Sequence, residues 1–379
     1  MAATCSLGHL LYFDFLPFIS LLTSLYVVAG GLKLRFSLRP SPLANTLFLG
    51  LFSILAGFMG TTGAAMLGIH PLLLLNQKRK HKTHTVLFFI FLVCNVGGGF
   101  STLGDPPLFM GFLRGVSFLW PTQYLWAAVL AMVAALLALY AAVEALFFRK
   151  EPAPLHTPYD HPRIHIEGKK QLFLLGGIIL TMLIAPMLPL TPLLKETLKL
   201  GILGAIMAQS FRMTSLAWRR KHKWHWHPLQ EVAFIFLALF ITAEAPLKLL
   251  ALGPEGPFSF LFDLLSGPGG SPNPISYFWA TGLLSSLLDN APTYLVFFCV
   301  TGLDAQTLMT NATPILKAIS LGAVFMGALT YIGNAPNLLV KAIAEEEYHV
   351  KMPGFLAYSA LAAMTIVPIL GILLPFFLG

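Results

Sequence analysis

The sequence is poor in charge. Only 11% of its 379 residues are Asp, Glu, Lys or Arg, whereas a typical soluble domain carries about 25%. Hydrophobic residues make up 56%, and the mean hydropathy is +0.76. Apolar stretches long enough to cross a bilayer recur along the whole chain. These features exclude an ordinary soluble domain. They predict an all-α polytopic membrane protein whose spans form one integral domain.

Cysteine is scarce as well. Cys5, Cys94 and Cys299 form no motif, and two of them lie within apolar segments, so we expect no disulfide framework. The first apolar run lacks a basic region before it and a small-residue cleavage site, so we expect no cleavable signal peptide. The net charge of +8 does not indicate nucleic-acid binding, because the basic residues lie in short loops that orient a membrane protein.

The basic loops predict the topology. Two consecutive loops of this kind, at 33–39 and 78–82, should both lie in the cytoplasm. The apolar segment 46–75 between them must therefore return to the side on which it starts. It is interrupted at Gly60, and it is too short for two crossings of about 20 residues each. The segment is therefore predicted to form a re-entrant helical hairpin.

The same rule divides the rest of the chain. It predicts a first repeat over 1–147, which consists of a span, hairpin 46–75, broken helix 85–112 and a span. A cytoplasmic linker over 148–171 and two additional scaffold spans over 172–227 follow. The second repeat, over 228–379, consists of a span, hairpin 276–300, broken helix 315–343 and a span. The repeats are inverted, because the second starts on the opposite side of the membrane. Both chain termini are expected outside. The two additional spans have no counterpart before the first repeat, so such spans are either naturally absent or have been removed.

Four polar stretches interrupt the apolar segments, and they form two pairs. The stretches around Asp105 and Asn334 align without gaps at an offset of 229 residues, and the same offset relates Gly60 to Asp289. Each half therefore keeps the same spacing between its two stretches. Paired interruptions at matching positions of two halves are the best sequence indication of a secondary transporter's binding site. Two unrelated kinked helices would not share one offset.

Asp289 is the main candidate for the transported ion. A charged residue at membrane depth is costly and usually marks an ion or substrate pathway. Sodium is a hard cation and prefers oxygen ligands. Asp289 would bind sodium when ionised and a proton otherwise, and this competition is sufficient for exchange. The structural alternative is an acid that pairs with a lysine of a neighbouring helix.

Asp105 is the second candidate ligand for sodium. Because Pro106 and Pro107 follow it, Asp105 can equally be the N-cap of a helix, and both roles are compatible. Hydroxyl residues are weaker candidates than amides, because Ser and Thr often bond only to a helix carbonyl. The further candidates in the four stretches are Asn290, Thr293, Asn334 and Asn337, and then Thr61, Thr62, Ser101, Thr102 and Thr330.

These stretches resemble motifs of the ion transporter superfamily, which includes NhaD-type sodium/proton antiporters, citrate and dicarboxylate transporters, and arsenite permeases. Asp289-Asn290-x-Pro292 is similar to the Asp-Asn-x-Pro of the second hairpin in NhaD-type proteins. The stretch 98–105 is similar to their Gly-Gly-x-x-Ser/Thr-x-Ile-Gly-Asp. The resemblance covers essentially the whole chain.

The sequence departs from this pattern at two places. The first hairpin has Gly60-Thr61-Thr62, where NhaD-type proteins tend to carry a second Asp-Asn, so a symmetric second cation site is in doubt. The second broken helix has Asn334-Ala335-Pro336-Asn337 instead of a Ser/Ala-rich turn.

The resemblance implies exchange of sodium (or lithium) for protons by an elevator mechanism, in which a transport unit slides against a scaffold, usually in a homodimer. We expect no cofactor besides the transported sodium, and a location in the bacterial inner (plasma) membrane. The alternative is sodium-coupled symport of citrate or another carboxylate. The two acids, and the absence of Arg and Lys from the four stretches, favour a cation. An enzyme is not expected, because an intramembrane aspartyl protease would carry Gly-x-Gly-Asp where this chain has Thr102-Leu103-Gly104-Asp105.

The predicted topology places residues 76–84 and 219–227 in the cytoplasm and 252–275 outside. A Lys80→Cys variant on a cysteine-free background tests the first hairpin. The introduced cysteine should react with an impermeant reagent only after the cells are permeabilised. Labelling of Lys80→Cys in intact cells would contradict the hairpin.

Overall fold

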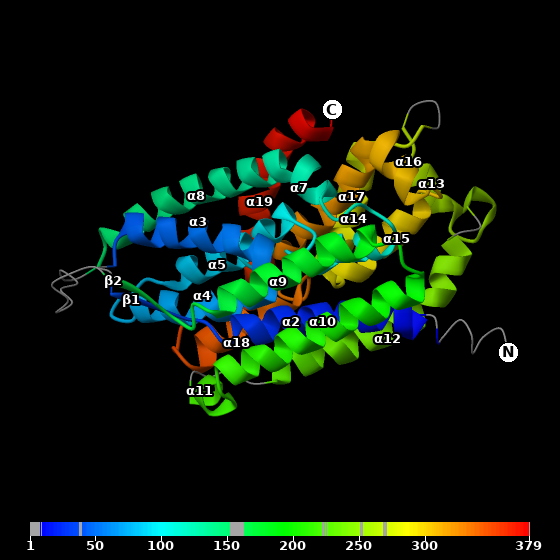
Figure 1. The fold of residues 1–379 in the computed structure, drawn as a ribbon. Coiled ribbons are helices and arrows are strands. Elements are labelled where there is room, and N and C mark those ends of the chain that lie inside the picture. Colours follow the sequence, from blue (N-terminus) through cyan, green and yellow to red (C-terminus); the bar gives the residue numbers. More distant parts are fainter. Residues whose placement is uncertain are drawn as a thin grey trace. The chain divides into compact units, whose positions relative to one another are not determined.

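The computed structural model describes residues 8, 10–37, 40–151, 163–221, 224, 226–250, 253–267 and 271–378. These residues are mostly helical (Figure 1). Five of the described helical segments are long and apolar enough to cross a membrane, by length and composition: Leu11–Ala29, Pro42–Met59, Thr83–Phe100, Trp126–Phe148 and Phe355–Leu378. The prediction of a polytopic helical membrane protein is confirmed at this level.

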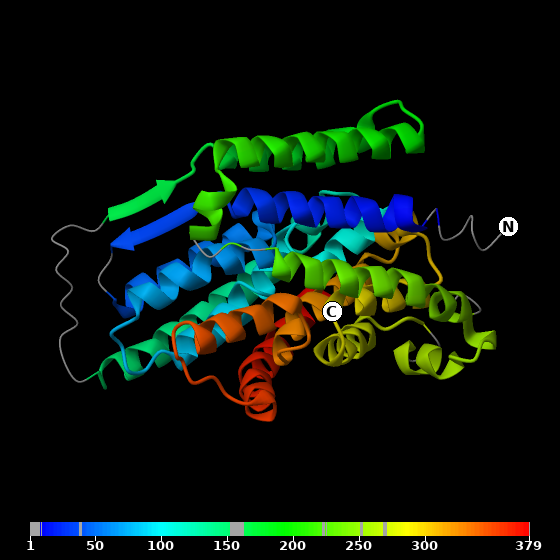
Figure 2. The ribbon, with the colours of Figure 1, turned by 90° about the horizontal axis from the view of Figure 1, so that it is seen from below.

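The chain divides into two compact units, and the first comprises Met1–Arg35 and His165–Pro246. Its described elements are η1 (Leu10–Phe15), α2 (Leu16–Ala29), α9 (Gln171–Ile184), η3 (Ala185–Met187), α10 (Pro192–Met213), α11 (Leu216–Lys221) and most of α12 (His227–Leu250). Helix α2 packs against both α9 and α10 (Figures 1 and 2). The buried Arg219 of α11 donates hydrogen bonds to the carbonyls of Val27 and Ser210, so its guanidinium ties α11 to α2 and α10.

The second unit comprises Phe36–Ile164 and Leu247–Gly379. Its helices before residue 164 are α3 (Pro42–Met59), α4 (Thr61–Leu75), α5 (Thr83–Leu92), η2 (Val96–Phe100), α6 (Pro106–Leu113), α7 (Trp120–Tyr124) and α8 (Trp126–Phe148). Those after residue 247 are η4 (Gly253–Glu255), α13 (Ser259–Leu265), α14 (Pro274–Leu287), α15 (Asn290–Val300), α16 (Ala305–Thr310), α17 (Thr313–Met326), η6 (Gly327–Leu329), α18 (Ala335–Glu346) and α19 (Phe355–Leu378).

The structure corrects the all-α prediction at one point. Strands β1 (Lys33–Ser37) and β2 (Arg163–Glu167) pair in a two-stranded sheet, and the boundary between the two units falls within each strand. Both segments alternate polar and apolar residues, which is the pattern of a strand. Their basic residues led to their interpretation as loop and linker. Residues 152–162 of the predicted linker lie outside the described part of the chain.

Two helix pairs lie where hairpins were predicted. Helices α3 and α4 meet at Gly60, whose φ is 80°, and they pack against each other. Helices α14 and α15 meet at residues 288 and 289 and also pack together. Because α3 alone has the length and apolarity of a membrane span, the re-entrant character of the first pair stays a prediction.

The two predicted broken helices are interrupted near the expected residues. Helix α5 is followed by η2 and then α6, and α17 by η6 and then α18. Both interruptions bring backbone against backbone. A Cβ atom on Gly104 would collide with the carbonyl of Gly98, and one on Gly333 would collide with the carbonyl of Gly327. These two glycines are therefore required for the close approach at the breaks.

Gly104→Ala and Gly333→Ala should lower the thermal unfolding temperature of the protein in detergent, because the added methyl group displaces a carbonyl at the break. Gly201→Ala in α10 is the matched control, since nothing lies within 4 Å of its added Cβ. That variant should be as stable as the wild type or more stable, because alanine is favoured over glycine within a helix by about 1 kcal/mol. Unchanged stability of Gly104→Ala would contradict the close approach.

Candidate functional site

Asp105 lies where the N-termini of four helices meet. It directly precedes α6, and Asn334 directly precedes α18. Thr61 and Asn290 are the first residues of α4 and α15. The four side chains are at most 2% exposed. The two predicted hairpins and the two predicted breaks thus bring one residue each to a common point within the second unit.

The three neighbours all donate hydrogen bonds to the Asp105 carboxylate. Thr61 Oγ1 lies 3.1 Å and Asn334 Nδ2 lies 3.0 Å from Oδ1. Asn290 Nδ2 lies 2.6 Å from Oδ2. Both amides must turn their N–H groups to the carboxylate, because a carboxylate only accepts. Helix N-termini carry partial positive charge, so the junction stabilises a buried anion without a basic residue.

The two acids differ in what they do. Asp105 is the N-cap residue of α6 by position, as predicted, but its side chain makes no capping hydrogen bond to that helix. Asp289 does cap its helix, since its Oδ1 accepts a hydrogen bond from the N–H of Ala291 at 3.1 Å. Asp289 is half-buried and interacts electrostatically with Asp105. Neither acid forms an ion pair with a lysine or arginine of the described residues.

A chain of buried amides connects the two breaks. Asn334 Nδ2 also contacts the carbonyl of Cys94 at 2.9 Å and Asn95 Oδ1 at 3.4 Å. Asn95 Nδ2 donates to Asn337 Oδ1 at 2.8 Å. Asn337 Nδ2 donates in turn to two carbonyls of the second break, at 2.9 and 3.0 Å. The hydrogen-bonding groups of Asn95 and Asn337 are thus engaged in holding the breaks together.

Asn290 differs from the other amides at the junction. Its Nδ2 is bound to Asp105, while its Oδ1 is buried and has no hydrogen-bond partner among the described residues. An unsatisfied buried acceptor costs about 1–3 kcal/mol and calls for an explanation. Here a free carbonyl oxygen lies on the same side chain that binds a carboxylate. A cation would satisfy both groups.

Two predicted ligands, Ser101 and Thr330, make the same structural contact in both halves. Ser101 Oγ donates to the carbonyl of Gly57, and Thr330 Oγ1 donates to the carbonyl of Ser286 at 2.5 Å. Thr330 and Ser286 lie 229 positions after Ser101 and Gly57, respectively. Each hydroxyl also accepts a backbone N–H at 3.1 Å. Ser101 and Thr330 therefore fasten the last turn of α3 or α14 to the neighbouring break.

The other predicted hydroxyls do not reach the Asp105 carboxylate. Thr102 Oγ1 donates to the carbonyl of Phe118 at 2.6 Å, and Thr293 Oγ1 donates to the backbone carbonyl of Asp289 at 3.1 Å. Thr62 is half-buried and makes no side-chain hydrogen bond within the described part of the chain. Of the predicted hydroxyl residues, the structure brings Thr61 to the carboxylate.

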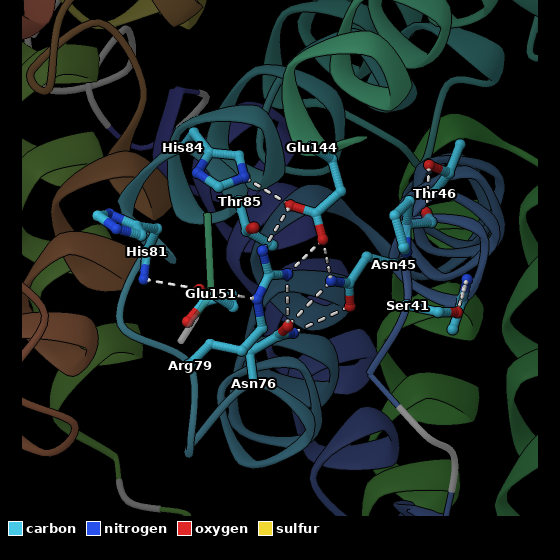
Figure 3. Close-up of polar contacts among 12 residues, drawn as sticks. Ser41, Asn45, Thr46, Asn76, Arg79, His81, His84, Thr85, Glu144 and Glu151 are labelled. Atoms are coloured by element: carbon cyan, nitrogen blue, oxygen red, sulfur yellow. Dashed lines mark hydrogen bonds and ion pairs between the residues drawn. The ribbon is translucent and has the colours of Figure 1, made fainter. Parts of the chain in front are cut away.

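A second buried polar cluster was not foreseen from the sequence. We call it the hairpin-base cluster, and it consists of Asn45, Asn76, Arg79, His84 and Glu144 (Figure 3). Glu144 is a single acid within the apolar span 126–148. An acid in a predicted span usually has a functional partner, so Glu144 could have been identified from the sequence as a candidate residue.

Ser101→Ala and Thr330→Val should each lower the free energy of unfolding by about 2 kcal/mol, because each removes two buried hydrogen bonds. Thermal unfolding in detergent measures the loss. Thr365→Val is the control, since that hydroxyl is exposed and bonds only to the Leu361 carbonyl of its own helix. Its effect should stay within about 0.5 kcal/mol. Equal stability of all three variants would show that the fastening is not needed.

Comparison with known proteins agrees with this picture. Two proteins named uncharacterized transporter, from Mycobacterium tuberculosis strains CDC 1551 / Oshkosh and ATCC 25618 / H37Rv, are each 35% identical to the chain over 99 residues. The match covers 26% of this chain and 22% of each relative, so the chain matches about a fifth of the length of these relatives. A family described as "Putative citrate transport" matches residues 1–378. This confirms the likeness to the ion transporter superfamily. The chain belongs to the family described as "Putative citrate transport".

Proposed function

We propose that the protein is a secondary transporter that exchanges sodium or lithium for protons, with Asp105 as its principal carboxylate. The observation that carries the proposal is the pairing of this carboxylate with the unsatisfied Oδ1 of Asn290. Both groups are oxygen acceptors, and hard cations prefer oxygen ligands. Asp289, on the same hairpin as Asn290, adds a second negative charge near the junction.

The geometry suggests how a proton and a cation compete. Ionised Asp105 accepts the Asn290 N–H group, and the Asn290 carbonyl oxygen is then available to a cation. A protonated Asp105 carries an O–H donor, which conflicts with an incoming N–H group. Rotation of the Asn290 amide resolves the conflict, because its free oxygen then accepts the new O–H. The same side chain thus serves both states, and protonation removes the charge that attracts the cation.

The proposed mechanism also includes inverted repeats and an elevator movement. The repeated fastening by Ser101 and Thr330, at the offset of 229 positions, supports the repeats. The second unit contains both hairpins and both breaks, while α2, α9 and α10 belong to the first unit. Such a division supports separate transport and scaffold units. The homodimer and the bacterial inner membrane location stay proposals drawn from the resemblance.

Sodium-coupled symport of citrate or another carboxylate is the second candidate. The family description favours it, and so does the meeting of four helix N-termini, which attract anions. The two carboxylates near this junction, and the absence of an ion pair from a described Lys or Arg to either of them, argue against direct binding of a polyanion. In this alternative Asp105 and Asn290 would bind the coupling sodium.

The test uses purified protein in liposomes with a pH indicator inside. Addition of sodium or lithium to the wild type should move protons, whereas potassium and citrate should not. Asp105→Asn should abolish this flux, because it removes the exchangeable proton. Asp289→Asn is the matched variant. It should retain proton flux, since asparagine is an equally good N-cap. The sodium concentration that gives half-maximal flux should rise, because the second negative charge is removed. Full flux in Asp105→Asn would assign the proton to another acid. Citrate-dependent sodium uptake without proton exchange would establish the symporter.

A further inference from the structure

The two legs of the first hairpin are fastened to each other at their base. Asn45 lies in the first turn of α3, and Asn76 follows the last residue of α4. Their side-chain amides exchange two hydrogen bonds, each 2.9 Å long. Both residues are at most 1% exposed. The reciprocal pair fixes where α3 begins relative to where α4 ends (Figure 3).

Glu144 fixes this base to α8. Its carboxylate accepts hydrogen bonds from Asn45 Nδ2 at 2.8 Å, from His84 Nε2 at 2.5 Å, and from both terminal nitrogens of Arg79. Arg79 Nη1 also donates to Asn76 Oδ1 at 3.1 Å. Glu151, just after α8, accepts the backbone N–H groups of residues 80 and 81 at 3.0 Å. Figure 3 shows the guanidinium between these groups.

The positions of the second hairpin that correspond to this cluster are described, and they do not repeat it. Moving each member of the hairpin-base cluster by the offset of 229 residues leads to Pro274, Ala305, Leu308, Thr313 and Leu373. These side chains carry neither charge nor amide. The cluster is therefore not a general feature of the repeated hairpin, and what it does concerns the first hairpin alone.

The base and the turn of the first hairpin are connected by one helix, which contains Pro71. Helix α4 runs from Thr61 at the turn to Leu75, next to Asn76, which is roughly 22 Å at 1.5 Å per residue. A tilt of about 3° at the base therefore displaces the turn by about 1 Å, a shift that can cost a site roughly a hundredfold in activity. Thr61 sits 3.1 Å from Asp105, so its hydrogen bond is sensitive to such a tilt.

Apolar packing holds only the inner face of α3, where Phe48, Leu49 and Phe52 are buried. One face of α3 is exposed, and its residues are Leu43, Leu47, Leu51, Ile54 and Phe58. Lipid is as apolar as these side chains, so no hydrophobic force presses the outer face of the hairpin against its neighbours. Directional polar contacts therefore hold the hairpin at both ends. Ser101 and the backbone N–H of Thr61, which donates to the Gly104 carbonyl at 2.8 Å, hold the turn, and the hairpin-base cluster holds the base.

We propose that Glu144 and Arg79 are positioning residues of the ion site: they clamp the base of the α3–α4 hairpin to α8 and thereby hold Thr61 against Asp105. The proposal rests on the proposed function. It adds two residues that lie a full helix length from the carboxylate. Their contribution to the site passes through Thr61.

A double-mutant cycle separates positioning from general stability. Glu144→Gln, Thr61→Val and the double variant are compared with the wild type by the sodium concentration that gives half-maximal proton flux in liposomes. Glu144→Gln and Thr61→Val should each raise this concentration about tenfold, as expected for one lost hydrogen bond to a charged group. The double variant should be no worse than Thr61→Val. Independent contributions would instead multiply, and that result would overturn the proposal.

Gln171→Leu supplies the matched control. Gln171 is a buried polar residue of the first unit, bonded to Ser210 and Thr214. Its loss should leave the half-maximal sodium concentration unchanged, alone or together with Thr61→Val, although it lowers the unfolding temperature. A shift in sodium dependence as large as that of Glu144→Gln would show that any buried polar defect has this effect, and would contradict a specific positioning role.

A second variant covers the case in which Glu144→Gln does not fold. Removal of one partner of a buried ion pair leaves a charge unpaired, whereas replacement of both by apolar residues is often tolerated. Arg79→Met with Glu144→Met should therefore fold and show the same tenfold shift. Wild-type sodium dependence in this folded variant would refute the proposal.

The position of the hairpin turn can also be measured without transport, which keeps this proposal separate from the proposed function. Thr62→Cys on a cysteine-free background places a thiol at the half-buried position beside Thr61. Its alkylation rate should rise severalfold when Arg79→Met and Glu144→Met are added. A higher rate supports the clamp even if the wild type moves no protons. An unchanged rate overturns it whatever the transport assay shows.

Discussion

The structure depends on the burial of one carboxylate inside a helical membrane protein without a basic partner among the described residues. Transfer of an isolated carboxylate out of water is prohibitive unless hydrogen bonds and local charge compensate. Asp105 receives three hydrogen bonds, and each comes from the N-terminus of a different helix. Four helices must therefore start at one point. One chain provides these four helix N-termini within the second unit through its two hairpins and its two breaks, where glycines allow close contact.

Neutral amides surround this carboxylate rather than cations, and this choice has chemical consequences. A lysine or arginine would neutralise Asp105 permanently and leave no affinity for a transported cation. An asparagine satisfies one carboxylate oxygen and retains an acceptor of its own. The orphaned Oδ1 of Asn290 is thus a cost to the empty protein that binding of a cation would recover. In the proposed exchanger the site fills and empties, and this unsatisfied oxygen favours its filling.

The sequence located the interruptions well and assigned their residues less well. A constant offset between Gly60 and Asp289, and between Asp105 and Asn334, was visible because small, polar and proline residues are rare in apolar helices. The roles of the two acids were not visible, since the donors to Asp105 come from three distant segments. The hairpin-base cluster was missed for the same reason. Glu144 stands out within an apolar span, but its partners lie in a basic loop and at helix ends, where polar residues are ordinary, and their meeting is a property of the folded chain.

The two hairpins, although related by one offset, differ in mechanical character. Here the first hairpin is braced at its base by a guanidinium and a carboxylate, while the matching positions of the second hold Leu308 and Leu373. The base of the second hairpin is held instead by a backbone hydrogen bond from Asn273 to the Leu265 carbonyl, 2.9 Å long. Asn290 and Asp289 belong to the second hairpin, so the charged and orphaned groups lie on the half of the repeated frame that lacks an ion-paired brace at these positions.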